Sequence, residues 1–337
     1  MSNYSYSESL PPLQPGDLLN GGEYRIVSET VNQGGFGRIY RAVNTKGTYR
    51  RKYAVKEFCL DEQFEQRTTM GDITRMETDG LVAALESKFF MEAKALFLMY
   101  DNVQHSFVPQ IYSYPCKEED GRMYYLMEYV EGPTLTEEIE NWGPMPEERA
   151  LGFIKVVCHT LEHAHNLGLT HSDVNPNNII LKEYNYPVLL DFGNARNYSA
   201  ELLLSNMNDR MRQGFGPYQE ALERAERKVP ELSDYYLEQL NNIGTQGFSY
   251  PYGYAGQVIG DVYSVAATLF FMLTGEKPNP SESYMQWNLC VMKKHGVTKR
   301  TRRVIINALT LQTESVSDFM HGLRETRETD INLRHVL

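Results

Sequence analysis

The sequence predicts an α+β fold in which strands fill the first part of the chain and helices fill most of the rest. Short runs rich in β-branched and aromatic residues recur between residues 24 and 128, separated by glycine and polar residues. From residue 146 onward, apolar residues recur at helical spacing over longer stretches. We therefore expect a small antiparallel sheet with one helix, followed by a larger, mainly helical part.

The composition excludes several classes of protein. The 337 residues suffice for two domains or for one two-lobed domain. With 33 Lys and Arg against 44 Asp and Glu, the net charge is −11, so the chain lacks the basic footprint of a nucleic-acid-binding protein. The longest apolar run, residues 262–273, is too short to cross a bilayer, and no signal-peptide pattern opens the chain. Four scattered cysteines without zinc spacing favour a reducing compartment: Cys59, Cys116, Cys158 and Cys290. We expect a soluble, cytoplasmic protein.

Local patterns predict the following elements. Residues 1–18 are rich in Ser, Tyr and Pro and predict a flexible tail, and the polar residues 58–80 predict an insertion. The expected helices cover residues 81–100, 146–168, 261–275, 284–294, 299–311 and 316–324, and strands are expected over residues 107–114 and 123–128.

Residues 171–193, HSDVNPNNIILKEYNYPVLLDFG, carry the clearest chemistry in the chain. Residues 178–182 read as a strand, residues 184–187 as a turn, and residues 188–190 as a second strand, which together predict a hairpin. The hairpin would bring Asp173, Asn178 and Asp191 to one edge. Carboxylate and amide oxygens suit a hard cation such as Mg²⁺, which proteins usually bind together with phosphates. This edge therefore predicts a phosphate-transfer site.

Two features nearer the N-terminus fit a phosphate-bearing ligand. Two β-rich runs flank Gly34, Gly35 and Gly37, and glycine allows backbone N–H groups to approach phosphates closely because it has no Cβ. The strand KYAVKEF then alternates so that Ala54 and Lys56 share one face. A lysine on an inward-facing position needs an anionic partner.

These motifs together resemble the protein kinase superfamily. HSDVNPNNIIL followed by DFG resembles the kinase catalytic loop and metal turn, GGFGRIY resembles the Gly-rich loop, and MEYVEGPTL resembles the hinge. The N-terminal part looks particularly like bacterial Ser/Thr kinases. The resemblance implies a bilobal protein-kinase-like fold, with an N-lobe over residues 19–128 and a C-lobe over residues 129–337.

The resemblance also implies roles for individual residues. Asp173 would orient the substrate hydroxyl, while Asn178 and Asp191 would hold Mg²⁺ beside ATP. Lys56 would bind the α- and β-phosphates and pair with Glu92, for which Glu86 is the competing candidate. Further ATP contacts would come from Gly34, Gly35 and Gly37, from Val31, Ile39 and Ala54, and from Met127, Glu128, Val130 and Ile180.

Two more expectations concern structure around the site. In the family, an aspartate at the position of Asp261 braces the catalytic loop, although an acid in the first turn of a helix is the simpler reading. His159 and His163 have the i, i+4 spacing of metal ligands, but no HExxH glutamate accompanies them, which favours structural histidines.

The chain departs from the family at five positions. Asn32 replaces the first glycine of the Gly-rich loop, and Ser172 replaces the arginine that reads a phosphorylated activation segment. Asn175 replaces the lysine that neutralises the γ-phosphate, a loss typically costing about 2–4 kcal/mol of barrier. Tyr252 replaces the glutamate that ends the activation segment, and the arginine that pairs with this glutamate is also missing.

An insertion of about fifty residues separates the metal turn from the end of the activation segment. Residues 195–243 contain two helix-like stretches, 200–212 and 218–242, which are candidates for partner docking or for a solvated surface elaboration. GFSYPYGY at 247–254 fits the end of the segment, whereas an alternative register would use GFGPYQE at 214–220.

Three functions are compatible with these patterns. An active Ser/Thr protein kinase, with protein substrates that include itself, is favoured by the five matching residues Lys56, Glu92, Asp173, Asn178 and Asp191. A nucleotide-binding pseudokinase that acts as a scaffold would explain the departures in the catalytic loop. A small-molecule phosphotransferase shares HxDxxxxN but does not explain GGFG, AVKEF and MEYVEGPTL.

Overall fold

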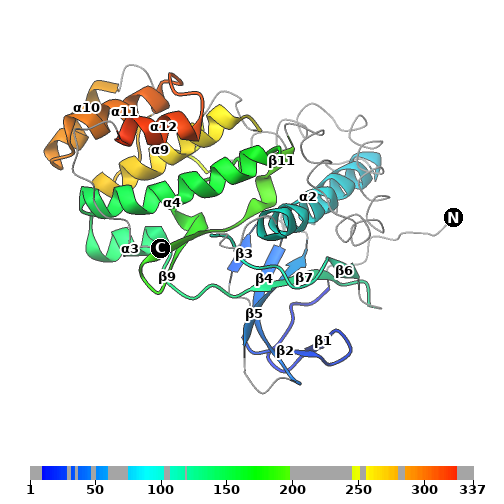
Figure 1. Cartoon of the computed structure of the whole chain (residues 1–337). Coiled ribbons are helices and arrows are strands. Elements are labelled where there is room, and N and C mark those ends of the chain that lie inside the picture. Colours follow the sequence, from blue (N-terminus) through cyan, green and yellow to red (C-terminus); the bar gives the residue numbers. More distant parts are fainter. Residues whose placement is uncertain are drawn as a thin grey trace.

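The computed structural model describes most of the chain, shown in Figure 1. The described residues are 10–28, 32–34, 37–46, 51–59, 75–101, 107–117, 120–197, 245–250, 256–279 and 285–324. Several predictions fall outside them, among them those for Val31, Gly35 and Tyr252, and nearly all of the insertion over residues 195–243.

The N-terminal part is an antiparallel sheet, as predicted. Its seven strands run in the order β1-β2-β4-β5-β7-β6, with β3 paired to β4. They are β1 (Leu18–Leu19), β2 (Tyr24–Ile26), β3 (Asn32–Gly34), β4 (Gly37–Asn44), β5 (Lys52–Phe58), β6 (Cys116–Lys117) and β7 (Met123–Glu128). Alternation along β4, β5 and β7 gives the sheet two faces. The face that carries Lys56 is called the inner face here, and the face that carries Glu57 the outer face.

One long helix, α2 (Arg75–Asp101), accompanies this sheet. It begins six residues earlier than predicted, so residues 75–80 belong to the helix and not to the insertion expected over 58–80. Residues 60–74 lie outside the described part. The predicted apolar face is buried at Leu85, Phe89, Ala93 and Leu96. Burial of this apolar stripe places the helix against the sheet, near the junction of the two lobes.

The C-terminal part is mainly helical, as predicted, and lies above the sheet in Figure 1. Its helices are α3 (Leu135–Trp142), α4 (Glu147–Asn166), α9 (Val258–Thr274), α10 (Met285–Lys294), α11 (Lys299–Leu309) and α12 (Val316–Arg324). Every residue of α9 from Asp261 onward is buried, so this helix forms the centre of the lobe. Among the described residues, no helix is both long and apolar enough to cross a membrane.

The predicted hairpin lies at the junction of the two lobes. Strand β9 (Ile179–Lys182) pairs with β10 (Tyr186–Leu189), and Pro187, expected in the turn, belongs to the second strand. Two short 3₁₀ turns flank the hairpin, η1 (Pro176–Asn178) and η2 (Phe192–Asn194). Strands β8 (Leu169–Thr170) and β11 (Arg196–Asn197) pair beside it.

Two predictions about the N-terminal part are wrong. Residues 107–114 form no regular strand, because only an isolated bridge from Ile111 to Met127 and a few backbone hydrogen bonds join them to β7. Residues 10–18 are not a free tail, because Leu13 is only 5 % exposed and packs in the outer-face core with Leu19, Tyr40 and Val55. The folded lobe therefore begins at least as early as Leu10.

Candidate active site

A lysine and two carboxylates from three separate elements meet at the inner face of the sheet. Lys56 Nζ of β5 lies 2.6 and 2.7 Å from the carboxylate oxygens of Glu92 on α2, and 3.2 Å from Asp191 Oδ1. The lysine side chain is 13 % exposed and Glu92 is 4 % exposed, whereas Asp191 is 46 % exposed. The cluster therefore combines a buried lysine, Lys56, with the Asp191 carboxylate, which remains accessible to a ligand. Glu92, and not the competing Glu86, is the glutamate bonded to Lys56.

The charges of this cluster stabilise one another. Burial alone would lower the pKa of Lys56, but the carboxylates of Asp191 and Glu92 outweigh it and raise this pKa above its ordinary value. The same lysine holds the pKa of the Asp191 carboxyl below its ordinary value. Burial raises the pKa of Glu92, although Lys56 opposes this effect. At neutral pH the site thus keeps a charged lysine next to an ionised Asp191.

The turn at Asp191 depends on its neighbours. Asp191 has a left-handed backbone, with φ 58° and ψ 74°, and accepts a hydrogen bond from the Gly193 N–H at 3.2 Å. A Cβ on Gly193 would lie 2.9 Å from Asp191 Oδ1 and 3.5 Å from Glu92 Oε2, so a side chain at this position would displace the Asp191 carboxylate. Phe192 is fully buried and packs edge-on against His171 with ring centroids 4.6 Å apart.

His171 joins the catalytic loop to this turn. The Asp173 N–H donates to His171 Nδ1 at 3.3 Å, and His171 Nε2 lies 2.8 Å from the carbonyl oxygen of Leu190. Nδ1 is therefore the acceptor and Nε2 carries the proton, which makes the ring a neutral bridge. This bridge fixes the distance between the segment of Asp173 and the segment of Asp191.

Asp173 is held by residues on both sides. Its Oδ1 accepts hydrogen bonds from the backbone N–H of Thr245 at 3.0 Å and from the Thr245 hydroxyl at 2.8 Å. Asn178 Nδ2 donates to Asp173 Oδ2 at 3.2 Å and to the Asp173 carbonyl at 3.0 Å. The amide nitrogen of Asn178 is thus committed to Asp173, and its oxygen is the atom suited to a metal.

Asn175 is part of the same network and is only 1 % exposed. Its amide nitrogen lies 3.0 Å from both the Thr245 hydroxyl and the Asp173 carbonyl, and its oxygen caps η1 by accepting from the Asn177 N–H. Asn175 therefore supplies no charge to the site. It organises the loop around Asp173 instead.

Asp261 lies fully buried beneath the catalytic loop. It accepts hydrogen bonds from the backbone N–H groups of His171 at 2.9 Å and Ser172 at 2.7 Å, and its Oδ2 lies 2.8 Å from His165 Nε2. These contacts lower the pKa of Asp261 although burial opposes them. The geometry matches the brace expected from the sequence.

Ser172 has a left-handed backbone, with φ 64°, where the family has arginine. Its hydroxyl lies 3.0 Å from the Thr170 hydroxyl and accepts from the Gly256 N–H at 3.1 Å. The serine therefore ties the catalytic loop directly to the chain that leads into α9.

The structure brings together some of the residues expected to contact the adenine ring. Ala54 of β5 and Met127 of β7 are register partners on the inner face, and Ile39 of β4 is the partner of Lys56. A Cβ on Gly132 would lie 3.2 Å from Ile180 Cγ2, so the segment after the hinge closes on β9. Glu128 ends β7 and binds Lys182 Nζ at 2.6 Å, while Val130 is buried.

The described strands on the two sides of the glycine turn pair with each other. Gly34 of β3 pairs with Gly37 of β4, and Asn32, at the position of the family's first glycine, pairs with Ile39. A Cβ on Gly37 would lie 3.2 Å from the Glu57 carbonyl and 3.3 Å from Lys56 Cε, so this glycine lets β4 approach the lysine closely.

Sequence reasoning missed Thr245, which makes two hydrogen bonds to Asp173. The signal was present as GTQGF at residues 244–248, just before the stretch that resembles the end of an activation segment. About seventy residues separate Thr245 from Asp173, so local patterns gave no reason to join them.

Comparison with known proteins identifies the family. A family model described as "Protein kinase domain" matches residues 25–211, more than half of the chain. The chain therefore belongs to the protein kinase domain family.

Bacterial proteins are among the curated relatives. The chain is 29 % identical over 271 residues to "Serine/threonine-protein kinase C" of Synechocystis, covering 78 % of this chain and 41 % of the relative. It is 25 % identical to "Serine/threonine-protein kinase PknA" of Nostoc, covering 79 % of this chain and 40 % of the relative. The chain thus spans about two-fifths of the length of these relatives.

A solved structure shares the fold. The crystal structure of Rad53 residues 1–466 in complex with AMP-PNP aligns with a TM-score of 0.55 at 16 % identity, covering 90 % of this chain and 65 % of that chain. At this identity the likeness establishes the bilobal fold alone.

Proposed function

We propose that this chain is an ATP- and Mg²⁺-dependent protein kinase that transfers the γ-phosphate to Ser or Thr hydroxyls of protein substrates, its own among them. The observation that carries the proposal is the cluster of Lys56, Glu92 and Asp191, which the His171 bridge joins to the segment of Asp173. The names of the bacterial relatives support the choice of Ser and Thr as acceptors. The scattered cysteines support a cytoplasmic location.

In this proposal Lys56 binds the α- and β-phosphates of ATP, and Glu92 keeps its ammonium group in place. The adenine ring lies against the inner face at Ala54, with Met127 at the rear of the pocket and Val31, Ile39, Val130 and Ile180 nearby. The backbone at Glu128 and Val130 bonds the edge of the ring. Gly34, Gly35 and Gly37 let the glycine turn cover the phosphates. The protein mainly positions groups and stabilises charge.

Asp173 receives the substrate hydroxyl. Its Oδ1 already accepts two hydrogen bonds from Thr245, which fills both lone pairs, whereas Oδ2 accepts one bond from Asn178. We therefore assign Oδ2 as the oxygen that accepts the hydroxyl proton and aligns the nucleophile with the γ-phosphate.

The donor set fits magnesium. Asp191 offers a partly exposed carboxylate and Asn178 offers an amide oxygen, both hard ligands of the kind Mg²⁺ prefers. When bound, the ion would neutralise the negative charge that the β- and γ-phosphates bring to the site. Lys56 already bonds Asp191 and so orients its carboxylate before any ligand binds.

A pseudokinase remains the second candidate because of Asn175. This residue is buried and neutral where the family has a lysine, so the γ-phosphate lacks one expected cation. We propose that turnover is slow or that another cation substitutes. A small-molecule phosphotransferase finds no support in the names of the protein relatives.

Calorimetry and label transfer separate these readings. Mg-ATP binding by the purified protein, followed by γ-label on Ser or Thr of protein substrates, supports the kinase. Binding without label on any protein supports the scaffold reading. Label that appears on metabolites and on no protein supports the small-molecule reading. An Asp173→Ala variant is the control in each assay, since it should bind nucleotide but transfer nothing.

Residues 198–243 of the insertion lie outside the described part of the chain, and the length of the insertion supports a role in choosing partners. We propose that it extends the substrate platform. Deleting residues 198–240 should change which proteins are phosphorylated, and an unchanged substrate set at an unchanged rate would contradict this role.

A further inference from the structure

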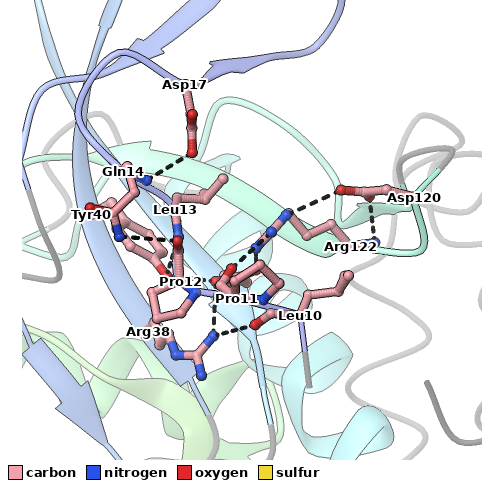
Figure 2. A network of polar contacts seen from close by, with 11 residues as sticks. Leu10, Pro11, Pro12, Leu13, Gln14, Asp17, Arg38, Tyr40, Asp120 and Arg122 are labelled. Atoms are coloured by element: carbon pink, nitrogen blue, oxygen red, sulfur yellow. Dashed lines mark hydrogen bonds and ion pairs between the residues drawn. The ribbon is translucent and has the colours of Figure 1, made fainter. Parts of the chain in front are cut away.

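The N-terminal segment of residues 10–17, called the strap here, crosses the outer face of the N-lobe sheet. Figure 2 shows its carbonyl groups facing two arginines. Arg38 Nη1 of β4 donates to the Leu10 carbonyl at 3.0 Å, and Arg122 Nη2, just before β7, donates to the Pro11 carbonyl at 2.9 Å. The Leu13 N–H donates to the Tyr40 hydroxyl at 3.2 Å. Three side chains of the N-lobe therefore hold the strap at Leu10, Pro11 and Leu13.

The same three side chains surround one buried carboxylate. Glu57 of β5 is only 2 % exposed. Its Oε1 forms a short ion pair with Arg122 Nη1, and its Oε2 accepts a hydrogen bond from the Tyr40 hydroxyl at 2.8 Å. Arg38 Nη1 lies 3.9 Å from Glu57 Oε2, the oxygen that also accepts the Tyr40 hydrogen bond. A buried carboxylate is costly unless it is paired and hydrogen-bonded. The side chains that hold the strap are thus the same ones that surround the buried Glu57.

In both β4 and β5, a residue of this network directly follows a residue of the proposed nucleotide site. Glu57 follows Lys56 in β5, and Arg38 follows Gly37 in β4, so each outer-face anchor neighbours an inner-face site residue. Arg38 and Glu57 are also register partners, next to the pair of Ile39 and Lys56. A shift of β4 or β5 on the outer face would therefore move the inner face as well.

The strap itself is held by few apolar contacts. Leu13 is its only fully buried side chain among residues 10–17, and residues 11, 12 and 14–17 are exposed. Segments with so little buried apolar area open more readily than core strands. The strap is therefore held on the sheet by Leu13, by Tyr40 and the two arginines, and at its end by backbone hydrogen bonds of Gly16 and Asp17 with Ile26 of β2.

We propose that the strap is a positioning element for the nucleotide-binding strands, acting through Arg38, Arg122 and the buried Glu57. When docked, it completes the outer-face network and restrains β4 and β5, which carry Gly37 and Lys56. When undocked, it releases both strands and uncovers Tyr40. The consequence for nucleotide affinity rests on the proposed function, whereas the restraint of the strands does not.

The test compares two leucines that differ in burial. Leu13 of the strap is 5 % exposed, and Leu18, just beyond it, is 54 % exposed. In Leu13→Ala, without any nucleotide, the amides of β4 and β5 should exchange with solvent about tenfold faster or more. In Leu18→Ala they should exchange within about twofold of the wild type. The Mg-ATP dissociation constant should rise about fivefold or more in Leu13→Ala alone, with kcat little changed.

A second variant keeps the proposal testable if Leu13→Ala unfolds. A chain lacking residues 1–15 is mixed with a synthetic peptide of residues 8–15, and a peptide carrying Leu13→Asp is the control. The intact peptide should restore slow exchange in β4 and β5, and the control peptide should not. Exchange that is unchanged without the strap, or that rises equally in Leu18→Ala, overturns the proposal. A wild type that fails to bind Mg-ATP would overturn the proposed function, and the exchange measurement would still decide the role of the strap.

Discussion

Thr245 donates two hydrogen bonds to a single oxygen of Asp173, one from its backbone N–H at 3.0 Å and one from its hydroxyl at 2.8 Å. The two residues lie on segments about seventy positions apart, so the contact joins the chain after the insertion to the catalytic loop. The backbone bond places Thr245 beside Asp173, and the hydroxyl fills the second lone pair of Oδ1.

Replacing Thr245 tests whether this contact orients Asp173. Thr245→Ala removes the hydroxyl bond, and since hydrogen bonds to charged groups contribute about 1.5–3 kcal/mol, we expect kcat to fall about tenfold or more. Thr245→Ser keeps the hydroxyl and should retain most of the activity. Equal rates for the alanine and serine variants, measured as initial label transfer at saturating ATP, would show that the hydroxyl has no such role.

Replacing Asn175 tests the missing cation. Asn175→Lys would place a positive charge next to Asp173, and we expect faster phosphate transfer per folded molecule because one charge-stabilising donor is worth about 2–4 kcal/mol of barrier. The variant should also be less stable, because Asn175 is buried and caps η1. Single-turnover transfer rates and urea unfolding measure the two effects separately. An unchanged rate would contradict the hypothesis that the missing cation at Asn175 affects turnover.

Asp261 should be a large contributor to stability. It is fully buried and accepts two backbone N–H groups while also facing His165. In Asp261→Asn an amide N–H group would oppose a backbone N–H donor, so we expect a loss of about 2–4 kcal/mol in the free energy of unfolding. Urea unfolding provides the measurement. Glu131→Gln, at a carboxylate that is 63 % exposed, is the matched control and should change stability very little.

Acid should destabilise the site through Asp191. Lys56 holds the pKa of this carboxyl below its ordinary value, so its stabilising contribution is present above the unfolded pKa of about 4 and is lost as pH falls through the folded pKa. Lys56 has a raised pKa, so its contribution is constant in this range and is lost only at alkaline pH.

The free energy of unfolding, measured with urea at constant ionic strength, should therefore fall more steeply in the wild type than in Asp191→Asn between about pH 5 and pH 2. Equal slopes in the two proteins would contradict the assigned ion pair. Asp318→Asn, at an exposed aspartate of α12, is a control for the general effect of removing one carboxyl.

Much of this fold follows from local patterns. The helix predicted over residues 316–324 is α12, and the strand predicted over 123–128 is β7, because both have a clear period and clear boundaries. The start of α2 was predicted six residues too late, since the polar residues of its first turns resemble those of a loop.

Other parts depend on contacts that no local pattern contains. The strap was predicted as a tail because residues 10–18 offer few apolar side chains, yet Arg122 reaches Pro11 across 111 positions. Thr245 was missed for the same reason. The juxtaposition of Lys56 and Glu92, in contrast, was predictable because a strand lysine that faces inward requires an acidic partner, and the resemblance named the helix.

The most direct test of the proposed activity is the transfer of label from γ-labelled ATP by the purified protein with Mg²⁺, compared with Asp173→Ala. A Lys56→Met variant should weaken nucleotide binding, and phosphorylated residues are mapped by mass spectrometry. We predict label on Ser or Thr of protein that disappears in Asp173→Ala. Label that persists in Asp173→Ala, or Mg-ATP binding by the wild type without any labelled protein, would contradict a kinase that acts through Asp173.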